Sequence, residues 1–278
     1  MTLQLAITGA TGHVGGEVAR RLSAAGFEQK LFVRDPARAP QLSAARIATG
    51  SYTDKQSAID ALRGSEILFM VSASEAEDRV HQHRTFIDAA AEAGVQHIVY
   101  TSFLAAAKDS IFTLGRDHWA TEEHIRRSGM DFTFLRDNLY LDFFPLFADD
   151  DGVIRGPAGN GRVAAVARTD VARAAVVVLQ DPDAHGGKTY DLTGPAALSL
   201  EEAAATITKI TGREVRYQEE TVEEAYASRA HYGVPQWQLD AWVSTYTAIA
   251  SGQLARTTTA VRDLTGSAPL TLDALLRQ

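Results

Sequence analysis

The sequence predicts an α/β fold, a Rossmann-like doubly wound parallel sheet with a smaller, mostly helical C-terminal lobe. Over the first half of the chain, short β-rich runs alternate with helical stretches, which indicates βαβ crossovers and a parallel sheet. A glycine-rich turn follows the first of these runs. After Arg136 the alternation stops, and an aromatic, turn-rich and then mostly helical segment follows.

The predicted strands are apolar on both faces, as a sheet covered by helices on both sides requires. They lie at Leu3–Thr8, Lys30–Arg34, Arg46–Tyr52, Glu66–Ser74, His97–Ser102 and Asp131–Arg136. Apolar residues at helical spacing predict the intervening helices, at 12–26, around Ile59 and Leu62, at 79–94 and at 115–129. Beyond them we expect a helix at 169–182, a strand at 188–194 and mainly helices from Ser199.

Composition narrows the class of protein. The 278 residues are 45% hydrophobic and 22% charged, which is typical of a globular chain. The absence of cysteine excludes disulfides, thiolate metal sites and cysteine nucleophiles. A net charge of −8 opposes nonspecific binding to nucleic acid. Because there is neither a signal-peptide pattern nor a long apolar run, we expect a soluble cytoplasmic protein without membrane contact. We further expect a monomer or a homodimer.

The turn "TGATGHVGG" carries Gly9, Gly12 and Gly15 at G-x-x-G-x-x-G spacing between a predicted strand and a helix. Glycine allows a sharp turn, close approach of the backbone to a pyrophosphate, and tight packing of the helix on the strand. The phosphates then meet the positive end of the helix. The position in a βαβ unit favours a dinucleotide site over a tight turn without a ligand.

The end of the second strand bears on the choice of dinucleotide. An acid there binds the ribose hydroxyls of NAD, whereas an arginine favours the 2′-phosphate of NADP. Arg34 is the first polar residue after the apolar run, and Arg38 could assist it. Asp35 could instead serve NAD, and Arg34 could be only a solvated surface residue. We favour NADP(H) over NAD(H).

Four segments resemble one known family: "ITGATGHVGG", "VSASEAEDRVHQHRTFIDAAAEAGVQHIVYTS", "HWATEEHIRRSGMDFTFLRDNLYLDFF" and "KTYDLTGPAALSLEEAAATI". The chain resembles the NmrA-like, atypical branch of the short-chain dehydrogenase/reductase superfamily. It is most similar to the NADPH:quinone oxidoreductase (type 2) and triphenylmethane reductase members. The resemblance implies a Rossmann domain with a smaller lobe and NADP(H) as cofactor, without flavin or metal. Some members of this branch bind the nucleotide and regulate transcription.

The resemblance also implies a set of site residues along the carboxyl edge of the sheet. Ser72 and Ser74 close the fourth strand, where the cofactor ribose is expected to pass, and Thr101, Ser102 and Phe103 close the fifth, near the nicotinamide. The expected cofactor-binding residues are Gly9, Thr11, Gly12, His13, Val14, Gly15, Arg34, Ser72, Ser74, Thr101, Ser102, Phe103 and Asn138. One departure is Gly50–Ser51, where relatives often have an aspartate near the adenine.

Typical members of the superfamily use a Tyr-x-x-x-Lys pair on the helix after the fifth strand, and this chain lacks it. There is no tyrosine between Tyr100 and Tyr140 and no lysine between Lys108 and Lys188. Reduction of a carbonyl to an alcohol, which needs a proton delivered to an alkoxide, is therefore disfavoured. A quinone or a cationic dye needs mainly stacking and orientation, because its reduced form is weakly basic or already neutral.

Two further groups are candidates for the acceptor site. Aromatic residues after Arg136, chiefly Tyr140, Phe143 and Phe144, could form a substrate pocket together with Phe103, Phe147 and Trp237. The alternative is that they are core. His118 and Glu122 lie four residues apart on a helix and occupy the register of the missing pair. His118 could face the cofactor, oriented by Glu122, and supply a proton. The alternative is a buried histidine beside an exposed glutamate, and no metal site is expected.

These observations predict an NADPH-dependent oxidoreductase that passes a hydride to a flat electron-poor acceptor, foremost a quinone. The alternatives are a non-catalytic NADP(H)-sensing regulator that acts through a protein partner, or a triphenylmethane-dye-type reductase. We expect residues 1–136 to form the NADP-binding domain, to which 165–192 return. Residues 137–162 and 193–278 would form the substrate-binding lobe.

Overall fold

The structure is a computed structural model that describes residues 5–278. The chain divides into two compact units, and each is described by itself. Unit 1 comprises the chain up to Ser102 together with Asp117–Arg136 and Val171–Tyr190. Unit 2 comprises Phe103–Arg116, Asp137–Asp170 and Asp191–Gln278. The expectation that all of 1–136 forms one domain is wrong for Phe103–Arg116, because Phe103 and Phe112 pack in the core of unit 2.

Seven strands form the central sheet, in the order β3-β2-β1-β4-β5-β6-β9. The pairs β1–β2, β2–β3, β1–β4 and β4–β5 are parallel. The predicted strand Leu3–Thr8 corresponds to β1, and its first two residues lie outside the described part of the chain. The strands are β1 (Leu5–Ile7), β2 (Gln29–Val33), β3 (Ala45–Thr49), β4 (Ile67–Met70), β5 (His97–Phe103), β6 (Asp131–Asp137) and β9 (Lys188–Leu192).

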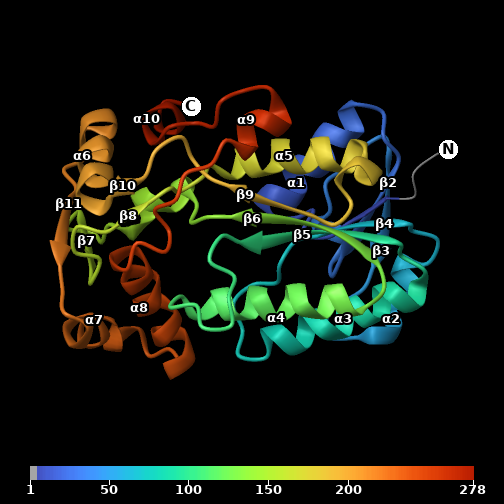
Figure 1. The fold of residues 1–278 in the computed structure, drawn as a ribbon, viewed down its shortest axis with the longest axis horizontal. Coiled ribbons are helices and arrows are strands. Elements are labelled where there is room, and N and C mark those ends of the chain that lie inside the picture. The colour runs from blue at the N-terminus through green and yellow to red at the C-terminus, as the bar shows by residue number, and fades with distance from the viewer. Residues whose placement is uncertain (1–4) are drawn as a thin grey trace. The chain divides into compact units, whose positions relative to one another are not determined.

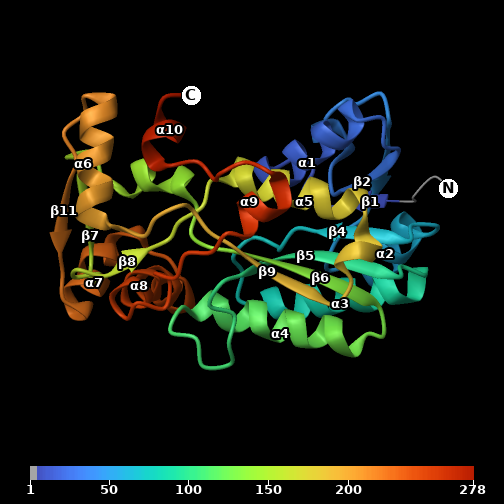
Figure 2. The ribbon, with the colours of Figure 1, turned by 45° about the horizontal axis from the view of Figure 1, so that its top comes forward.

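Helices cover both faces of this sheet (Figures 1 and 2). One face carries α1 (His13–Ala24) and α5 (Arg168–Gln180), and the other carries α2 (Lys55–Leu62), α3 (Arg79–Ala93) and α4 (Thr113–Arg127). A core of buried aliphatic and aromatic side chains, including Leu68, Phe86 and Phe134, lies where this second layer meets the strands. Strands buried on both faces explain the continuous apolar runs in the sequence.

The strand order reverses direction between β1 and β4. From β1 the chain proceeds to β2 and β3 at one edge of the sheet, with the short 3₁₀ helix η1 (Pro36–Arg38) between these two strands. It then returns to β4, next to β1, and continues through β5 and β6 towards the opposite edge. In open α/β sheets, ligands bind at this switch point, outside the carboxyl ends of the strands. The Rossmann-like doubly wound fold predicted from the sequence is confirmed.

Unit 2 contains short strands besides helices. β11 (Arg216–Glu219) pairs in parallel with β7 (Val153–Gly156), and β10 (Leu198–Ser199) pairs antiparallel with β8 (Arg162–Val163). Leu141, Phe144, Ile207 and Ile249 belong to its buried core. Its helices are η2 (Leu141–Phe147), α6 (Leu200–Thr211), α7 (Val222–Arg229), η4 (Ala230–Tyr232), α8 (Gln236–Ala250), α9 (Ala260–Thr265) and α10 (Leu272–Leu276), while η3 (Pro182–His185) lies in unit 1.

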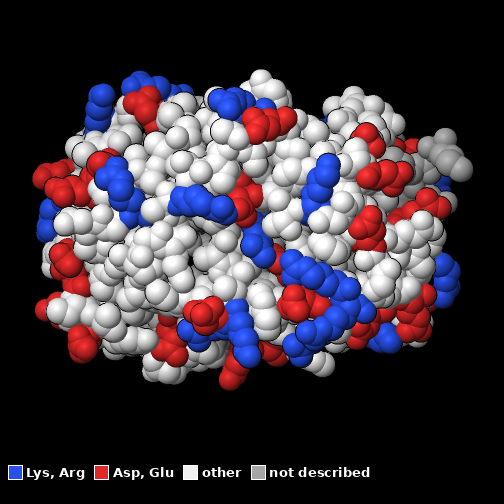
Figure 3. Space-filling view, viewed as in Figure 1, with Lys and Arg blue, Asp and Glu red and all other residues white. Residues whose placement is uncertain are grey.

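Charged side chains of both signs lie next to one another on the face shown in Figure 3. Two of the ion pairs of the described residues are Arg126–Glu123 (2.9 Å) and Arg162–Glu202 (2.5 Å). Within residues 5–278, no helix is long and apolar enough to cross a membrane.

Candidate cofactor-binding site

The glycine turn joins β1 to α1 at the switch point. Gly9 has a φ of +65°, and a Cβ there would lie 2.9 Å from the Cβ of Val71, so this position needs glycine for both conformation and space. The Gly12 N–H donates to the Gly9 carbonyl at 2.9 Å and closes the turn. A Cβ on Gly15 would lie 2.5 Å from the Gly9 carbonyl oxygen. The helix can therefore pack against the turn only because Gly15 has no side chain.

This turn leaves the amino end of α1 open to an anion. Gly12 caps the helix in an extended conformation without a side-chain hydrogen bond, and the first turn carries no acidic residue. The N–H groups of His13, Val14 and Gly15 have no partner within the helix, because the first turn of any α-helix lacks the preceding carbonyls. Free N–H groups and the positive end of the helix dipole are the donor set that suits a phosphate. The cradle fits a pyrophosphate on these grounds.

Arg34 and Asp35 follow β2 and have different roles. The Asp35 carboxylate caps η1 and accepts a hydrogen bond from the Ala37 N–H at 3.0 Å. Arg34 is exposed, and within residues 5–278 its guanidinium has no hydrogen bond or ion pair. The carboxylate is thus engaged in local structure, while the guanidinium is available to a ligand phosphate.

Hydrogen bonds tie the carboxyl ends of β1 and β4 together. The Thr8 hydroxyl accepts from the Val71 N–H at 2.8 Å and donates to the Phe69 carbonyl at 3.2 Å. The Tyr52 hydroxyl, 2.8 Å from Thr8 Oγ1, donates to the Val71 carbonyl at 2.7 Å. Burial raises the pKa of Tyr52. These bonds fix the backbone beside the glycine turn.

Two buried side chains of α3 hydrogen-bond to the loop that follows β4. His83 Nε2 accepts from the Ala73 N–H at 2.9 Å, and its Nδ1–H donates to Thr121 Oγ1 at 2.8 Å, since that hydroxyl donates to the Asp117 carbonyl. Arg79 Nε donates to the Ala73 carbonyl at 2.9 Å. Ala73 is therefore clamped at both its N–H and its carbonyl, between Ser72 and Ser74.

His118 does not have the role expected of a proton donor. Its Nε2 lies 3.1 Å from Nη2 of Arg79, which can only donate, so Nε2 is the unprotonated acceptor. Nδ1 lies 3.0 Å from the Tyr100 hydroxyl. Burial, followed by the charge of Arg79, lowers the pKa of His118 well below its ordinary value. Both ring nitrogens have buried partners, and the lowered pKa favours the neutral ring, an arrangement that disfavours the acid role expected of His118.

Glu122 is also placed differently from the expectation. It is fully buried, and its carboxylate accepts from Ser102 Oγ at 2.6 Å and from both Arg136 Nε (2.8 Å) and Arg136 Nη2 (2.6 Å). Arg126 adds a further bond at 3.1 Å. The carboxylate is committed to this cluster and does not orient His118. Glu122 is therefore neither an exposed glutamate nor a member of an acid–base pair with His118.

The hydroxyl-bearing residues at the ends of β4 and β5 differ in their availability. Thr101 is buried, and its Oγ1 accepts from the Ser72 N–H at 2.9 Å, while Ser102 is engaged with Glu122. Their side chains therefore support the edge of the sheet from inside. Ser74 and Thr11 are exposed. Among the expected contacts that carry a hydroxyl, these two keep exposed side chains that can meet a ligand directly.

The expected site residues after β5 and β6 lie in unit 2, and several are structural. Phe103 is 5% exposed and packs on Phe112, with 4.9 Å between ring centroids. The Asn138 amide donates to the carbonyls of Ala164 (3.1 Å) and Leu254 (3.0 Å), so it holds two segments together and is not available to a cofactor. Phe144 is fully buried in the core. The side chains of these three residues therefore lie in the core of unit 2 and do not face a ligand in this structure.

Tyr140 and Phe143 retain partial access. The Tyr140 hydroxyl donates to Asp137 at 2.5 Å, and burial, followed by the Asp137 charge, raises its pKa well above the ordinary value. Phe143 is 39% exposed, and Arg168 lies 5.1 Å above its ring. No group of three or more His, Asp or Glu side chains within residues 5–278 is arranged to hold a metal ion.

The sequence did not predict the supporting roles of Arg79 and Tyr52, nor the hydrogen bonds that His83 makes to the loop after β4. A signal for Arg79 existed in its position, since it begins the helix that follows the β4 loop. His83 lies on the same face of α3 as the apolar Phe86 and Ile87, which indicates burial. Tyr52 gave no such signal, because its partners are 44 and 19 residues distant in the chain.

Comparison with known proteins identifies the family of this chain. The NmrA-like family matches residues 1–239. An NADPH-dependent quinone oxidoreductase from Escherichia coli, solved with NADPH, is 33% identical, with a TM-score of 0.90 over 99% of both chains. An NAD(P)H azoreductase from Xenophilus azovorans is 32% identical over 94% of this chain and 92% of its own length. The Citrobacter sp. triphenylmethane reductase solved with NADP(H) is 32% identical, with a TM-score of 0.85 over 99% of both chains. The chain belongs to the NmrA-like family.

Proposed function

We propose that this protein binds NADPH at the carboxyl edge of unit 1 and reduces a flat, electron-poor acceptor, foremost a quinone. It is an NAD(P)H-dependent oxidoreductase, the class named for its relatives from Escherichia coli and Xenophilus azovorans. The observation that carries the proposal is the glycine turn, where Gly9 and Gly15 leave room for the backbone and α1 presents unbonded N–H groups. In this proposal unit 1 holds the cofactor and unit 2 is the substrate-binding lobe.

The preference for NADPH over NADH rests on Arg34. Its guanidinium is unengaged within the described residues, whereas the neighbouring Asp35 carboxylate caps η1. An arginine at this position suits the 2′-phosphate that NADH lacks. A charge-assisted hydrogen bond to it contributes about 1.5–3 kcal/mol, which is roughly a tenfold to hundredfold preference.

The type of acceptor follows from how the two titratable side chains His118 and Glu122 of α4 are engaged. NADPH supplies the hydride when it is bound. His118 is neutral and engaged with Arg79, and Glu122 is engaged with Ser102 and Arg136, so neither is poised to donate a proton. An acceptor whose reduced form is weakly basic needs no such donor, because water can protonate it afterwards. Quinones meet this requirement, and conjugated dyes are the related alternative.

Variants at Arg34 test the cofactor choice. Arg34→Gln should weaken NADPH binding by tenfold or more and leave NADH binding nearly unchanged, measured by calorimetry. Arg46→Gln is the matched control, since Arg46 is also exposed and without an ion pair in the described chain, but lies within β3. Equal affinity of the wild-type protein for NADPH and NADH would reject the assignment of Arg34.

A panel of acceptors tests the reaction. NADPH oxidation is followed with a neutral quinone, an azo dye and a triphenylmethane dye, each against a control without protein. We expect turnover with the quinone. NADPH binding without turnover on any acceptor would reject the enzyme proposal and favour the sensor that acts through a protein partner.

A further inference from the structure

Unit 2 contains a hollow whose lining shares no residue with the cofactor-binding site described above. It has a volume of about 770 Å³, within the range of small-molecule sites, and lies among η2, the β7 strand, α7 and α8. Aromatic side chains form much of its wall, namely Phe147, Tyr232, Trp242 and Tyr246. Tyr232 is 59% exposed and meets the Trp242 ring edge-on, with 5.6 Å between centroids. The His231 ring lies against Tyr232 as well, with 4.0 Å between centroids, so the three rings form one cluster in the wall of the hollow.

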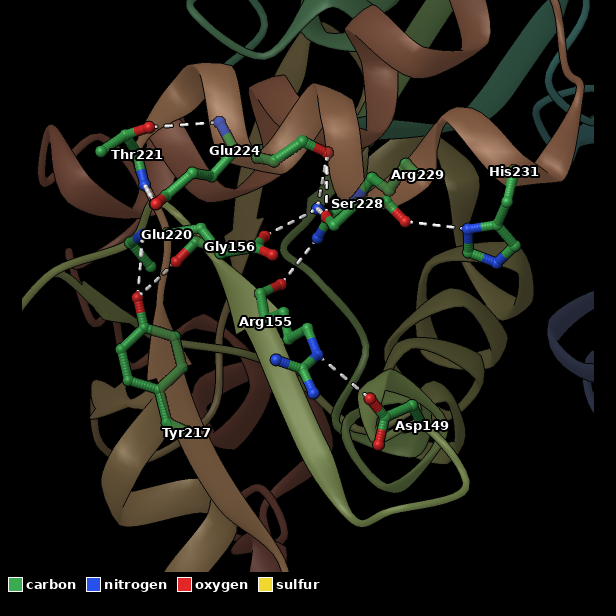
Figure 4. A network of polar contacts seen from close by, with 12 residues as sticks. Asp149, Arg155, Gly156, Tyr217, Glu220, Thr221, Glu224, Ser228, Arg229 and His231 are labelled. Carbon is green, nitrogen blue, oxygen red and sulfur yellow. Dashed lines mark hydrogen bonds and ion pairs between the residues drawn. The ribbon is translucent and has the colours of Figure 1, made fainter.

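The floor of the hollow is rigid (Figure 4). Arg229 is buried and donates to the carbonyls of Arg155 (2.6 Å) and Ala225 (2.9 Å), while its guanidinium lies 5.1 Å from the Tyr246 ring. A Cβ on Gly156 would lie 2.3 Å from the same ring, so β7 packs directly beneath it. The site is therefore formed before any ligand arrives.

Both arginines that line the hollow are already neutralised. Arg229 Nη1 pairs with Glu220 at 3.0 Å, and Arg155 Nε pairs with Asp149 at 3.2 Å (Figure 4). An anionic ligand would have to compete with these carboxylates. The arginines thus serve the structure of the floor and leave little positive charge for binding.

The unpaired charge in the hollow is negative. Asp150 and Asp151 line it and are exposed, and within residues 5–278 neither carboxylate has a hydrogen bond or an ion pair. They lie on the loop between η2 and β7, which forms the same hollow as the aromatic wall. Carboxylates beside aromatic rings attract cations, through their charge and through the negative π-face of any ring that the cation can reach.

We infer that this hollow in unit 2 binds a flat aromatic cation. The aromatic cluster that includes Trp242 supplies apolar and π contact surface, and Asp150 and Asp151 supply the opposite charge. The exposed Leu146 at the rim adds apolar contact. The inference goes beyond the proposed function, since it concerns binding by unit 2 and needs neither NADPH nor turnover.

Three probes with the same tricyclic ring test the charge preference: N-methylacridinium (cation), acridine (neutral) and acridine-9-carboxylate (anion). Calorimetry on the full chain without cofactor should give the order cation, neutral, anion, from tightest to weakest. Raising the salt from about 0.05 M to about 0.5 M should weaken only the cation, because screening acts on the charge term. Equal or tighter binding of the neutral or anionic probe would overturn the inference.

Variants locate the site. Asp150→Asn with Asp151→Asn should raise the Kd of the cation roughly tenfold and leave acridine unchanged, at a few tenths to about 1 kcal/mol per exposed charge. The matched control is Asp109→Asn with Glu201→Gln, two exposed carboxylates of unit 2 outside the hollow. Trp242→Ala should weaken all three probes. An unchanged Kd in the Asp150/Asp151 variant or in Trp242→Ala would place the binding elsewhere and overturn the inference. Because no turnover is measured, failure of quinone reduction would leave this result standing, and the reverse also holds.

Discussion

Gly15→Ala is the sharpest perturbation of the glycine turn. The added Cβ would lie 2.5 Å from the Gly9 carbonyl oxygen and 2.6 Å from the Thr8 carbonyl oxygen, and both are backbone atoms that no rotamer can move. Ordinary contact begins near 3.4 Å, so the helix and the turn must separate by about 1 Å. Forced overpacking of this kind costs about 1–3 kcal/mol. The expected fall in Tm is roughly 2–10 °C for a chain of this size.

The same displacement should weaken cofactor binding. Moving the N–H groups of Val14 and Gly15 by about 1 Å takes them beyond hydrogen-bond reach of a phosphate placed for the native helix. Loss of one charge-assisted bond, about 1.5–3 kcal/mol, raises the Kd for NADPH roughly tenfold to hundredfold. Thermal unfolding with and without NADPH, together with calorimetry, measures both effects.

Gly12→Ala is the matched control for stability. Gly12 is extended, and its Cβ would meet only the Gly9 carbonyl oxygen, at 3.3 Å, so the fold should be nearly as stable as the wild type. If Gly15→Ala kept the Tm and the NADPH affinity of the wild type, the reasoning about close packing at the turn would be refuted.

Two further predictions concern buried titratable groups. Burial, then the charge of Arg79, lowers the pKa of both His83 and His118. Below about pH 6.5 the unfolded chain therefore binds protons that the folded chain does not. The free energy of unfolding should be at its full value above about pH 6.5. As the pH falls below that value, it should decrease by about 1.4 kcal/mol per pH unit for each histidine. Denaturant titrations across this range measure the slope, which His83→Gln should reduce, and a flat profile would contradict the assignment. Glu122→Gln should destabilise the fold by about 1–3 kcal/mol. This is less than the loss of a fully enclosed ion pair would cost, because the arginines around Glu122 are partly exposed. The matched substitution Glu123→Gln, at a partly exposed residue, should cost under about 1 kcal/mol. Similar losses for the two variants would show that the Glu122 cluster contributes no more than a surface ion pair.

The sheet and the glycine turn were predictable from the sequence because their signals are local. Continuous apolar runs set the strands, and the spacing of Gly9, Gly12 and Gly15 set the turn. Phe103 and Asn138 were misplaced for a different reason. Their position after a strand was right, but whether a side chain faces a ligand or the core depends on partners such as Phe112 and Leu254, distant in the chain.

Helical spacing likewise failed for His118 and Glu122. It correctly put both on α4, four residues apart, yet two residues on one turn need not share a partner. Arg79 of α3 contacts His118, whereas Arg136 of β6 binds Glu122. Such long-range choices are made by burial and hydrogen bonding, which periodicity does not encode.

The most direct test of the central claim is single-turnover reduction of a quinone by NADPH carrying deuterium at C4 of its nicotinamide. The protein should oxidise NADPH with the quinone, do so more slowly with the deuterated cofactor, and show little change in that rate between His118→Gln and the wild type. NADPH that binds but is not oxidised would contradict the account. A rate that collapsed in His118→Gln, while the Tm held, would show instead that this histidine takes part in proton delivery.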